Sequence, residues 1–412
     1  MKQVFIILLA LVQLNTEAKG QKELFKGLWR AELHRRDSQL VVFNFETKKV
    51  NNRWQLVIRN AAERIVVNSV TVKGDSVNFT MPVFESEFRT QLQPDGSLKG
   101  IWFKGTALQT QQWLFTAYPN NSLRFEPIRG NHKYIITGRW AVSIIRPNGT
   151  SRPAVAEFVQ KGNQLSGTFL TPSGDYRYLE GIVTGNRMRL SVFDGAHAYL
   201  FTATLDNAEQ ISNGTFYSGY NGKETWTAVK DATAQLPDVG STPQLKEGEE
   251  RISFAFKDIN RNKISSSDER FRNKVVVVQL MGSWCPNCMD ETKFLNEFYI
   301  NNKHRGVEVV SLAYEYSTDF ERSRISLLKF QQRFNVQYPM LITGAWINDS
   351  LRTEKTLPQI TSIKVFPTSI FIGKDGKVKK MQAGFYGPGS GEHFEIYKKE
   401  FYQTIETLLM EK

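Results

Sequence analysis

The chain has 412 residues, of which 41% are hydrophobic and 23% are charged, and its net charge is +12. This length indicates two or three domains with cores of their own, and the composition excludes a disordered or membrane-embedded chain. A positive charge can indicate a nucleic-acid or anionic-lipid partner. Here Lys and Arg are scattered and no run of them reaches five, so we expect no nucleic-acid partner.

The first twenty residues have the pattern of a secretory signal peptide. Lys2 is followed by an apolar stretch at 4–12 and then by polar and small residues up to Gly20. That stretch is too short for a comfortable membrane span, so we expect residues 1–20 to direct export, with an uncleaved anchor as the alternative. No later run reaches about 18 apolar residues, which predicts no stable membrane insertion after cleavage.

An all-β region that contains a repeat is predicted from about residue 24 to 230. Short strands of alternating polarity are separated by turns rich in Gly, Asp and Asn. The Gly-x-Trp sequence at 27–29 recurs at 138–140, and Trp113 recurs as Trp226. The spacing between the copies is nearly constant, which indicates a duplication.

The duplication predicts two similar β units in tandem. We place repeat 1 at 24–119 and repeat 2 at 136–230, each with about six to eight strands in a small barrel or sandwich. Chance recurrence of common turn residues is the alternative. Packing inside the units explains the many aromatic residues, and a ligand-holding barrel or a protein-docking surface is the functional alternative.

The pattern changes after residue 230. Residues 231–250 lack periodicity and hold Pro and Gly among polar residues, which predicts a linker. From 251 to 412 strands alternate with helices, which predicts an α/β domain. We expect strands at 252–256, 275–281, 307–314, 368–372 and 377–381, and helices at 286–302, 318–334 and 393–410.

The only two cysteines of the chain, Cys285 and Cys288, lie where the strand at 275–281 turns into the helix at 286–302. C-x-x-C spacing brings the two sulfurs within bonding distance, and a helix N-terminus favours a thiolate on the first cysteine. We expect Cys285 to attack disulfides and Cys288 to resolve the mixed disulfide. A bond between such close neighbours constrains little of the unfolded chain, so the pair serves chemistry rather than stability.

Other uses of a cysteine pair fit this sequence poorly. Structural zinc requires four ligands, whereas one C-x-x-C supplies two and only His304 lies near it in sequence. Covalent haem requires a His directly after the second cysteine, where Met289 stands. The P-x-x-x-T-x-x-C arrangement of a peroxiredoxin is absent around Cys285. We therefore expect neither a metal nor an organic cofactor.

The Trp-Cys-x-x-Cys sequence at 284–288 after a hydrophobic strand, with Phe-Pro-Thr at 366–368 before a later strand, resembles the thioredoxin-fold proteins. In that family the proline is cis and faces the dithiol, where it receives the substrate backbone. Within that fold the sequence is similar to the TlpA/ResA-type exported reductases, which have a Glu three residues after the second cysteine. Glu291 holds that position, and residues 339–364 match the insertion of that branch.

The resemblance implies a role for Glu291 in handling the proton of Cys288. Thioredoxin has a buried acid at the position where this chain has Gln279. An exposed helix residue is the alternative for Glu291, and Glu315 at a strand end is a second candidate acid.

The resemblance also implies that Trp284 shapes the surface beside Cys285 and that Phe366 and Pro367 help to bind the client. The expected function is that of a bacterial thiol–disulfide oxidoreductase of the periplasm or cell envelope, acting as a reductase. Its partners would be a disulfide-bearing client protein and an upstream thiol donor. The alternative is a binding or scaffold protein in which the β repeats act and the thioredoxin-like part is a redox-controlled appendage.

Overall fold

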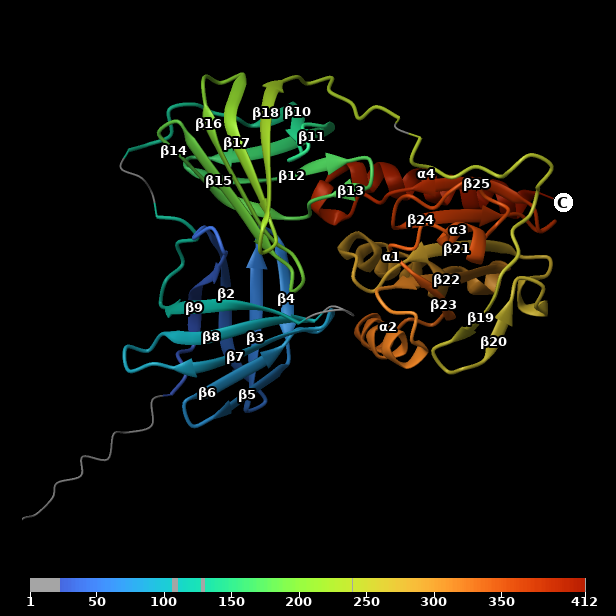
Figure 1. The fold of residues 1–412 in the computed structure, drawn as a ribbon, viewed down its shortest axis with the longest axis horizontal. Coiled ribbons are helices and arrows are strands. Elements are labelled where there is room, and N and C mark those ends of the chain that lie inside the picture. Colours follow the sequence, from blue (N-terminus) through green and yellow to red (C-terminus); the bar gives the residue numbers. More distant parts are fainter. Residues whose placement is uncertain (1–22, 106–109, 127–129, 239, 412) are drawn as a thin grey trace, which may run out of the picture.

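The computed structural model describes the chain except for residues 1–22, 106–109, 127–129, 239 and 412. The expected signal peptide at 1–20 therefore lies outside the described residues. Two β-rich units form the N-terminal part, and a unit of helices and strands forms the C-terminal part (Figure 1). None of the described helices combines the length and the apolar composition that a membrane crossing requires.

The first β unit is a nine-stranded antiparallel sheet with the order β4-β3-β2-β1-β9-β8-β7-β6-β5. The first strand pairs with both the second and the last, and the enclosed core is rich in Phe and Trp. The strands are β1 (Gly27–His34), β2 (Leu40–Val50), β3 (Arg53–Asn60), β4 (Glu63–Val67), β5 (Ser69–Lys73), β6 (Ser76–Thr80), β7 (Ser86–Leu92), β8 (Leu98–Gly105) and β9 (Thr110–Pro119).

The second β unit is also a nine-stranded sheet, and its order is β11-β10-β18-β17-β16-β15-β14-β12-β13. Since β11 also pairs with β12, this sheet closes into a barrel. The strands are β10 (Gly138–Ile145), β11 (Ser151–Lys161), β12 (Gln164–Thr171), β13 (Gly174–Asp175), β14 (Leu179–Thr184), β15 (Arg187–Phe193), β16 (Ala198–Leu205), β17 (Gln210–Ser218) and β18 (Gly222–Lys230).

Equivalent residues occupy equivalent places in the two units. Trp29 and Trp140 are fully buried in β1 and β10, and each of these strands pairs with the last strand of its unit. Gly74 and Gly185 both have φ near +56°, in the left-handed region where a side chain is strained. The expected duplicated all-β region is confirmed, with more strands per unit than expected because strands as short as β13 leave no alternation in the sequence.

The C-terminal unit is a seven-stranded mixed sheet with the order β20-β19-β23-β22-β21-β24-β25. Its strands are β19 (Ala255–Asp258), β20 (Lys263–Ser265), β21 (Val275–Met281), β22 (Val307–Glu315), β23 (Met340–Trp346), β24 (Thr368–Ile372) and β25 (Val378–Ala383). Its helices are α1 (Pro286–Asn302), α2 (Phe320–Phe334), α3 (Arg352–Thr356) and α4 (Glu392–Met410), with short 3-10 turns η1 (Glu269–Phe271), η2 (Lys303–Arg305) and η3 (Pro388–Ser390). Every residue of β21 and β22 is buried, as in a central parallel pair.

The structure differs from the sequence expectation at the edges of this unit. The strand expected at 252–256 begins only at Ala255, because Ile252 and Phe254 are buried without joining a strand. Strands β20 and β23 were not expected, and β23 and α3 lie within the expected insertion at 339–364. The end of the expected linker is also bound to this unit, since the backbone N–H of Lys246 donates to the carbonyl of Gln359.

Candidate active site

The two cysteines lie where β21 ends and α1 begins. Cys285 precedes the helix in an extended conformation, with φ −101° and ψ 118°, and its sulfur accepts a hydrogen bond from the backbone N–H of Cys288 at 3.3 Å. Pro286 occupies the first helical position, where a missing N–H costs nothing. Unpaired N–H groups at a helix start favour negative charge on the adjacent sulfur.

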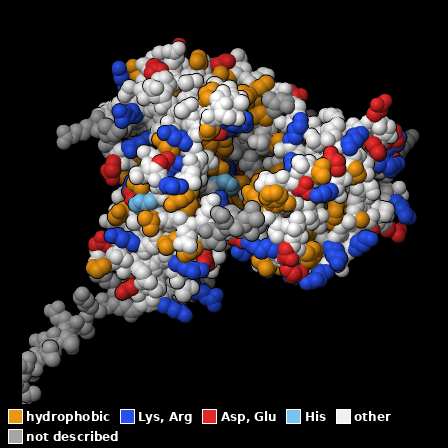
Figure 2. All heavy atoms as spheres, viewed as in Figure 1, with side chains coloured by type: hydrophobic (Ala, Val, Ile, Leu, Met, Phe, Trp, Pro, Cys, Tyr) orange, Lys and Arg blue, Asp and Glu red, His pale blue; other side chains and the backbone are white. Residues whose placement is uncertain are grey.

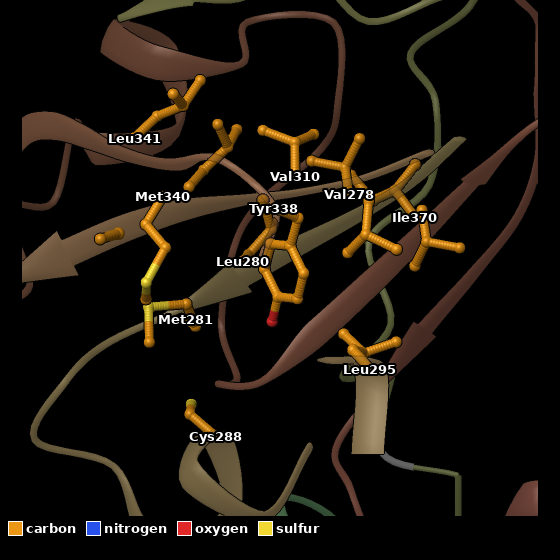
Figure 3. Close-up of a cluster of buried hydrophobic side chains, with 14 of the residues drawn as sticks. Val278, Leu280, Met281, Cys288, Leu295, Val310, Tyr338, Met340, Leu341 and Ile370 are labelled. Carbon is orange, nitrogen blue, oxygen red and sulfur yellow. The ribbon is translucent and has the colours of Figure 1, made fainter. Parts of the chain in front are cut away.

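The two thiols have different surroundings. Cys285 is 5% exposed, whereas Cys288 is fully buried and belongs to the apolar core that includes Leu280 and Met281 (Figure 3). Both are free thiols. Burial raises the pKa of Cys288 well above its usual value, and the neighbouring Cys285 adds to the effect. Cys288 therefore keeps its proton until a base accepts it.

The register of the sheet brings residues 366–367 to the dithiol. Leu280 of β21 lies opposite Thr368 of β24, so the residues before β24 face the loop that follows β21. The Phe366–Pro367 peptide bond is cis, and the thiol of Cys285 donates to the carbonyl of Phe366 at 3.6 Å.

Trp284 directly precedes Cys285 and packs against Phe366. Its Nε1 donates to the carbonyl of Tyr314 at 2.8 Å, and its ring meets Phe366 edge-on with 5.8 Å between ring centroids. The structure thus brings Trp284, Phe366 and Pro367 together around the first cysteine.

Glu291 lies one turn past Cys288 on α1, and its exposed fraction is 1%. The alternative of an exposed helix residue is therefore wrong. Its carboxylate accepts three hydrogen bonds, from Gln279 Nε2 at 2.8 Å, Ser369 Oγ at 3.0 Å and the Tyr397 hydroxyl at 3.0 Å. Burial raises the pKa of Glu291 to about 7, against the opposing effect of these donors. Gln279, which stands where thioredoxin has its buried acid, thus donates a hydrogen bond to the buried Glu291.

Glu315 is buried beside the loop that leads into the dithiol. Its carboxylate accepts from the backbone N–H of Ser283 at 2.8 Å and from the Ser283 hydroxyl at 2.6 Å. Burial raises its pKa to about 7. These contacts hold the turn before Trp284. Within the described ranges, no group of three or more His, Cys, Asp or Glu side chains is placed to hold a metal ion.

Residues of the second β unit also contact the segment that carries the two cysteines, here called the dithiol loop, and the sequence reasoning missed them. Arg177 forms an ion pair with Asp290 on α1 and donates to the carbonyl of Pro286 at 3.4 Å. With its amide oriented to satisfy both groups, Asn287 exchanges two 3.2 Å hydrogen bonds with the backbone of Asp175. No local pattern connects residues 175–177 with a motif so far along the chain.

The raised pKa of Glu291 predicts a specific pH dependence of stability. The folded state binds this proton more tightly than the unfolded state, where the pKa is near 4.5. The resulting stabilisation is fully present below pH 4.5 and is lost as the pH rises through about 7. We expect the unfolding free energy of wild type minus that of Glu291→Gln to fall by about 3 kcal/mol across this range.

Urea unfolding at a series of pH values measures this difference. Glu297→Gln, which changes an exposed glutamate on the same helix, is the control and should leave the pH slope of wild type intact. Equal slopes for wild type and Glu291→Gln would contradict the raised pKa.

Comparison with known proteins covers this C-terminal part. Residues 241–394 match the family model described as Redoxin. Thiol-disulfide oxidoreductase ResA of Bacillus cereus (strain ATCC 10987 / NRS 248) is 27% identical over 186 residues, which are 45% of this chain and 86% of that protein. ResA of Bacillus thuringiensis subsp. konkukian is 29% identical over 157 residues, 38% of this chain and 79% of that protein.

Among solved structures, a thiol-disulfide oxidoreductase from Bacteroides fragilis NCTC 9343 is similar at 20% identity and a TM-score of 0.28, covering 37% of this chain and 99% of that one. The family match and the ResA similarity agree with the dithiol at the start of α1. The C-terminal part of the chain is therefore a Redoxin domain, a thioredoxin-like thiol–disulfide oxidoreductase homologous to ResA.

Proposed function

We propose that the chain is an exported reductase of protein disulfides in a bacterial periplasm or cell envelope, using the dithiol of Cys285 and Cys288. The observation that carries the proposal is the position of the Cys285 sulfur, at a helix start and in contact with the carbonyl of Phe366. Export rests on the signal-peptide pattern of residues 1–20. The reductase direction rests on the resemblance to exported reductases.

The proposed reaction begins when the thiolate of Cys285 attacks one sulfur of a client disulfide. The client's S–S bond breaks, a mixed disulfide forms, and the leaving client sulfur takes up a proton. Cys288 then loses its proton and attacks the sulfur of Cys285, which releases the second client sulfur as a thiol. The client gains two electrons and two protons, and the resulting Cys285–Cys288 disulfide is reduced again by an upstream thiol donor.

We propose that Glu291 accepts the proton that Cys288 loses. The two groups are electrostatically coupled, since a charge on Glu291 raises the pKa of Cys288. A carboxyl with a pKa of about 7 changes its protonation state near neutral pH, as a general base should. Trp284 and Phe366 flank Cys285, and we assign them, with Pro367, to docking of the client segment.

The contacts of the second β unit with the dithiol loop bear on the binding-protein alternative. A β scaffold with an independent redox appendage gives no reason for Asp175 and Arg177 to contact Asn287 and Asp290. The reductase proposal accommodates these contacts, because they lie at the reacting group.

Trapping tests the proposed roles of the two cysteines. In Cys288→Ala the mixed disulfide cannot be resolved, so we expect client proteins to accumulate on Cys285 in the native host. Non-reducing electrophoresis detects these adducts, and a thiol reductant should release them. Cys285→Ala is the matched control and should trap nothing. Absence of adducts in Cys288→Ala would favour the binding-protein alternative.

Glu291→Gln tests the proposed base. We expect release of a labelled peptide from a mixed disulfide on Cys285 to slow by about 100-fold above pH 7, the low end of general-base contributions. The wild-type rate should rise through pH about 7 as Glu291 ionises, and the variant should lack this rise. Glu297→Gln should behave as wild type. An unchanged pH profile in Glu291→Gln would remove Glu291 from the mechanism.

The reductase direction predicts a reduction potential below about −180 mV for the Cys285–Cys288 pair, outside the range of oxidants such as DsbA. Equilibration with glutathione redox buffers, followed by alkylation of the remaining thiols, measures it. A potential well above that value would indicate an oxidase instead.

A further inference from the structure

A hairpin of the second β unit covers the dithiol. Residues 171–177, which we call the capping hairpin, connect the end of β12 through β13 to the segment before β14. β13 extends from the second unit toward α1 and α4 (Figure 1). On this face, apolar side chains lie near the place where the β units meet the Redoxin domain (Figure 2).

The tip of the capping hairpin is held by polar contacts with the segment that follows β25. Gly174 forms a parallel bridge with Phe385. The backbone N–H of Gly387 donates to Asp175 Oδ1 at 2.8 Å, and the hydroxyl of Tyr386 donates to the carbonyl of Thr171 at 3.1 Å. The tip therefore fits between the dithiol loop and this segment.

The base of the capping hairpin is held by Arg177. Its guanidinium is buried and forms ion pairs with Asp290 of α1 and with Glu63 of the first β unit. Removing one partner of a buried ion pair leaves an uncompensated charge and is strongly unfavourable. Arg177 thus ties both β units to the helix that begins at the dithiol.

Cys285 opens into a small cavity beneath the capping hairpin. The cavity has a volume of about 150 Å³, and its walls include Tyr176 from the hairpin, Tyr199 from β16, and Asn287 and Phe366 from the Redoxin domain. A cavity of roughly this size accommodates a molecule such as benzene, and drug-sized ligands occupy about 300–1,000 Å³. One small group can reach the sulfur of Cys285, whereas the surface of a folded protein cannot.

The apolar contacts between the β units and the Redoxin domain involve residues outside the hairpin tip, and Tyr386 packs next to the tip on the cluster of Val155, Leu170 and Ala234. Val83, Phe84 and Ala196 belong to the same apolar core as the Redoxin domain, and Glu85 is paired with Arg322 of α2. The hairpin tip contributes hydrogen bonds instead of a shared core. The tip can therefore lift while Arg177 keeps the base of the hairpin attached, since the contacts of the tip with the segment after β25 are hydrogen bonds.

We propose that the capping hairpin determines which disulfides reach Cys285: when docked it admits small disulfides and excludes those of folded proteins, which react only after it lifts. This inference rests on the proposed function and specifies its substrate access. The rate with a protein disulfide is then reduced by the fraction of molecules in which the hairpin is open. The rate with a small disulfide does not depend on that fraction.

Gly174→Ala is designed to lift the hairpin. Gly174 has φ +136°, and a Cβ there would lie 1.7 Å from the side-chain amide of Asn287 and 2.7 Å from the carbonyl oxygen of Phe385. Gly149→Ala in the same β unit is the matched control. Its φ of +81° is also in the range that side chains rarely adopt, but its Cβ would have no atom within 4 Å. Asp175→Ala, which removes the acceptor of the Gly387 N–H, is a second opening variant.

The experiment compares reduction of glutathione disulfide and of insulin by the full chain, with dithiothreitol as donor. We expect Gly174→Ala to raise the insulin rate by about tenfold or more and to leave the glutathione-disulfide rate within about twofold. Gly149→Ala should match wild type for both. An unchanged ratio of the two rates in folded Gly174→Ala and Asp175→Ala would overturn the inference.

Alkylation of Cys285 separates this inference from the proposed function. In a Cys288→Ala background, iodoacetamide should alkylate Cys285 at similar rates with and without the Gly174→Ala substitution. A polyethylene-glycol maleimide should react about tenfold faster with Gly174→Ala. If wild type and both opening variants reduce neither disulfide but show this alkylation pattern, the proposed function fails while the capping hairpin stands. If the bulky reagent reacts equally fast with all variants, the hairpin does not control access.

Discussion

The pairing of β21 with its two neighbours is the constraint on which the site depends. β21 is buried throughout and is hydrogen-bonded to β22 in parallel and to β24 in antiparallel register. Because β21 has a paired strand on each side and is buried on both faces, the position of its last residue is fixed. That end delivers Cys285 to the start of α1, and the register with β24 brings Phe366 to the same place. One buried strand thus positions both Cys285 and the backbone group that faces it.

A buried carboxyl beneath this junction couples the fold to the chemistry. Taking a carboxylate out of water is unfavourable unless donors satisfy it, and Gln279, Ser369 and Tyr397 supply those donors to Glu291. They come from β21, β24 and α4, so the core itself fixes the carboxyl near Cys288. The resulting balance of burial and hydrogen bonding leaves its pKa near neutrality. The same group therefore reduces stability when ionised and is suited to accept a proton.

The second β unit contacts the dithiol loop through one short segment. The second unit closes into a barrel, and the irregular turn between β12 and β14 carries Asp175 and Arg177 to the dithiol loop. A rigid barrel is well suited to position such a turn, because loops on a fixed scaffold can be placed accurately. The duplicated region and the Redoxin domain therefore meet at Cys285, and in our proposal both decide access to it.

The sequence by itself determined the features that depend on local spacing. These are the C-x-x-C at a helix start, Trp284 before it, Glu291 one turn later, and the order of β21, β22, β24 and β25 with α1, α2 and α4 in the Redoxin domain. Strands as short as β20 escaped prediction because a few residues show no period. Only the tertiary structure decided that Glu291 is buried and that residues 171–177 cover Cys285. Both follow from contacts between distant segments, and such contacts depend on how whole elements pack, which no local pattern encodes.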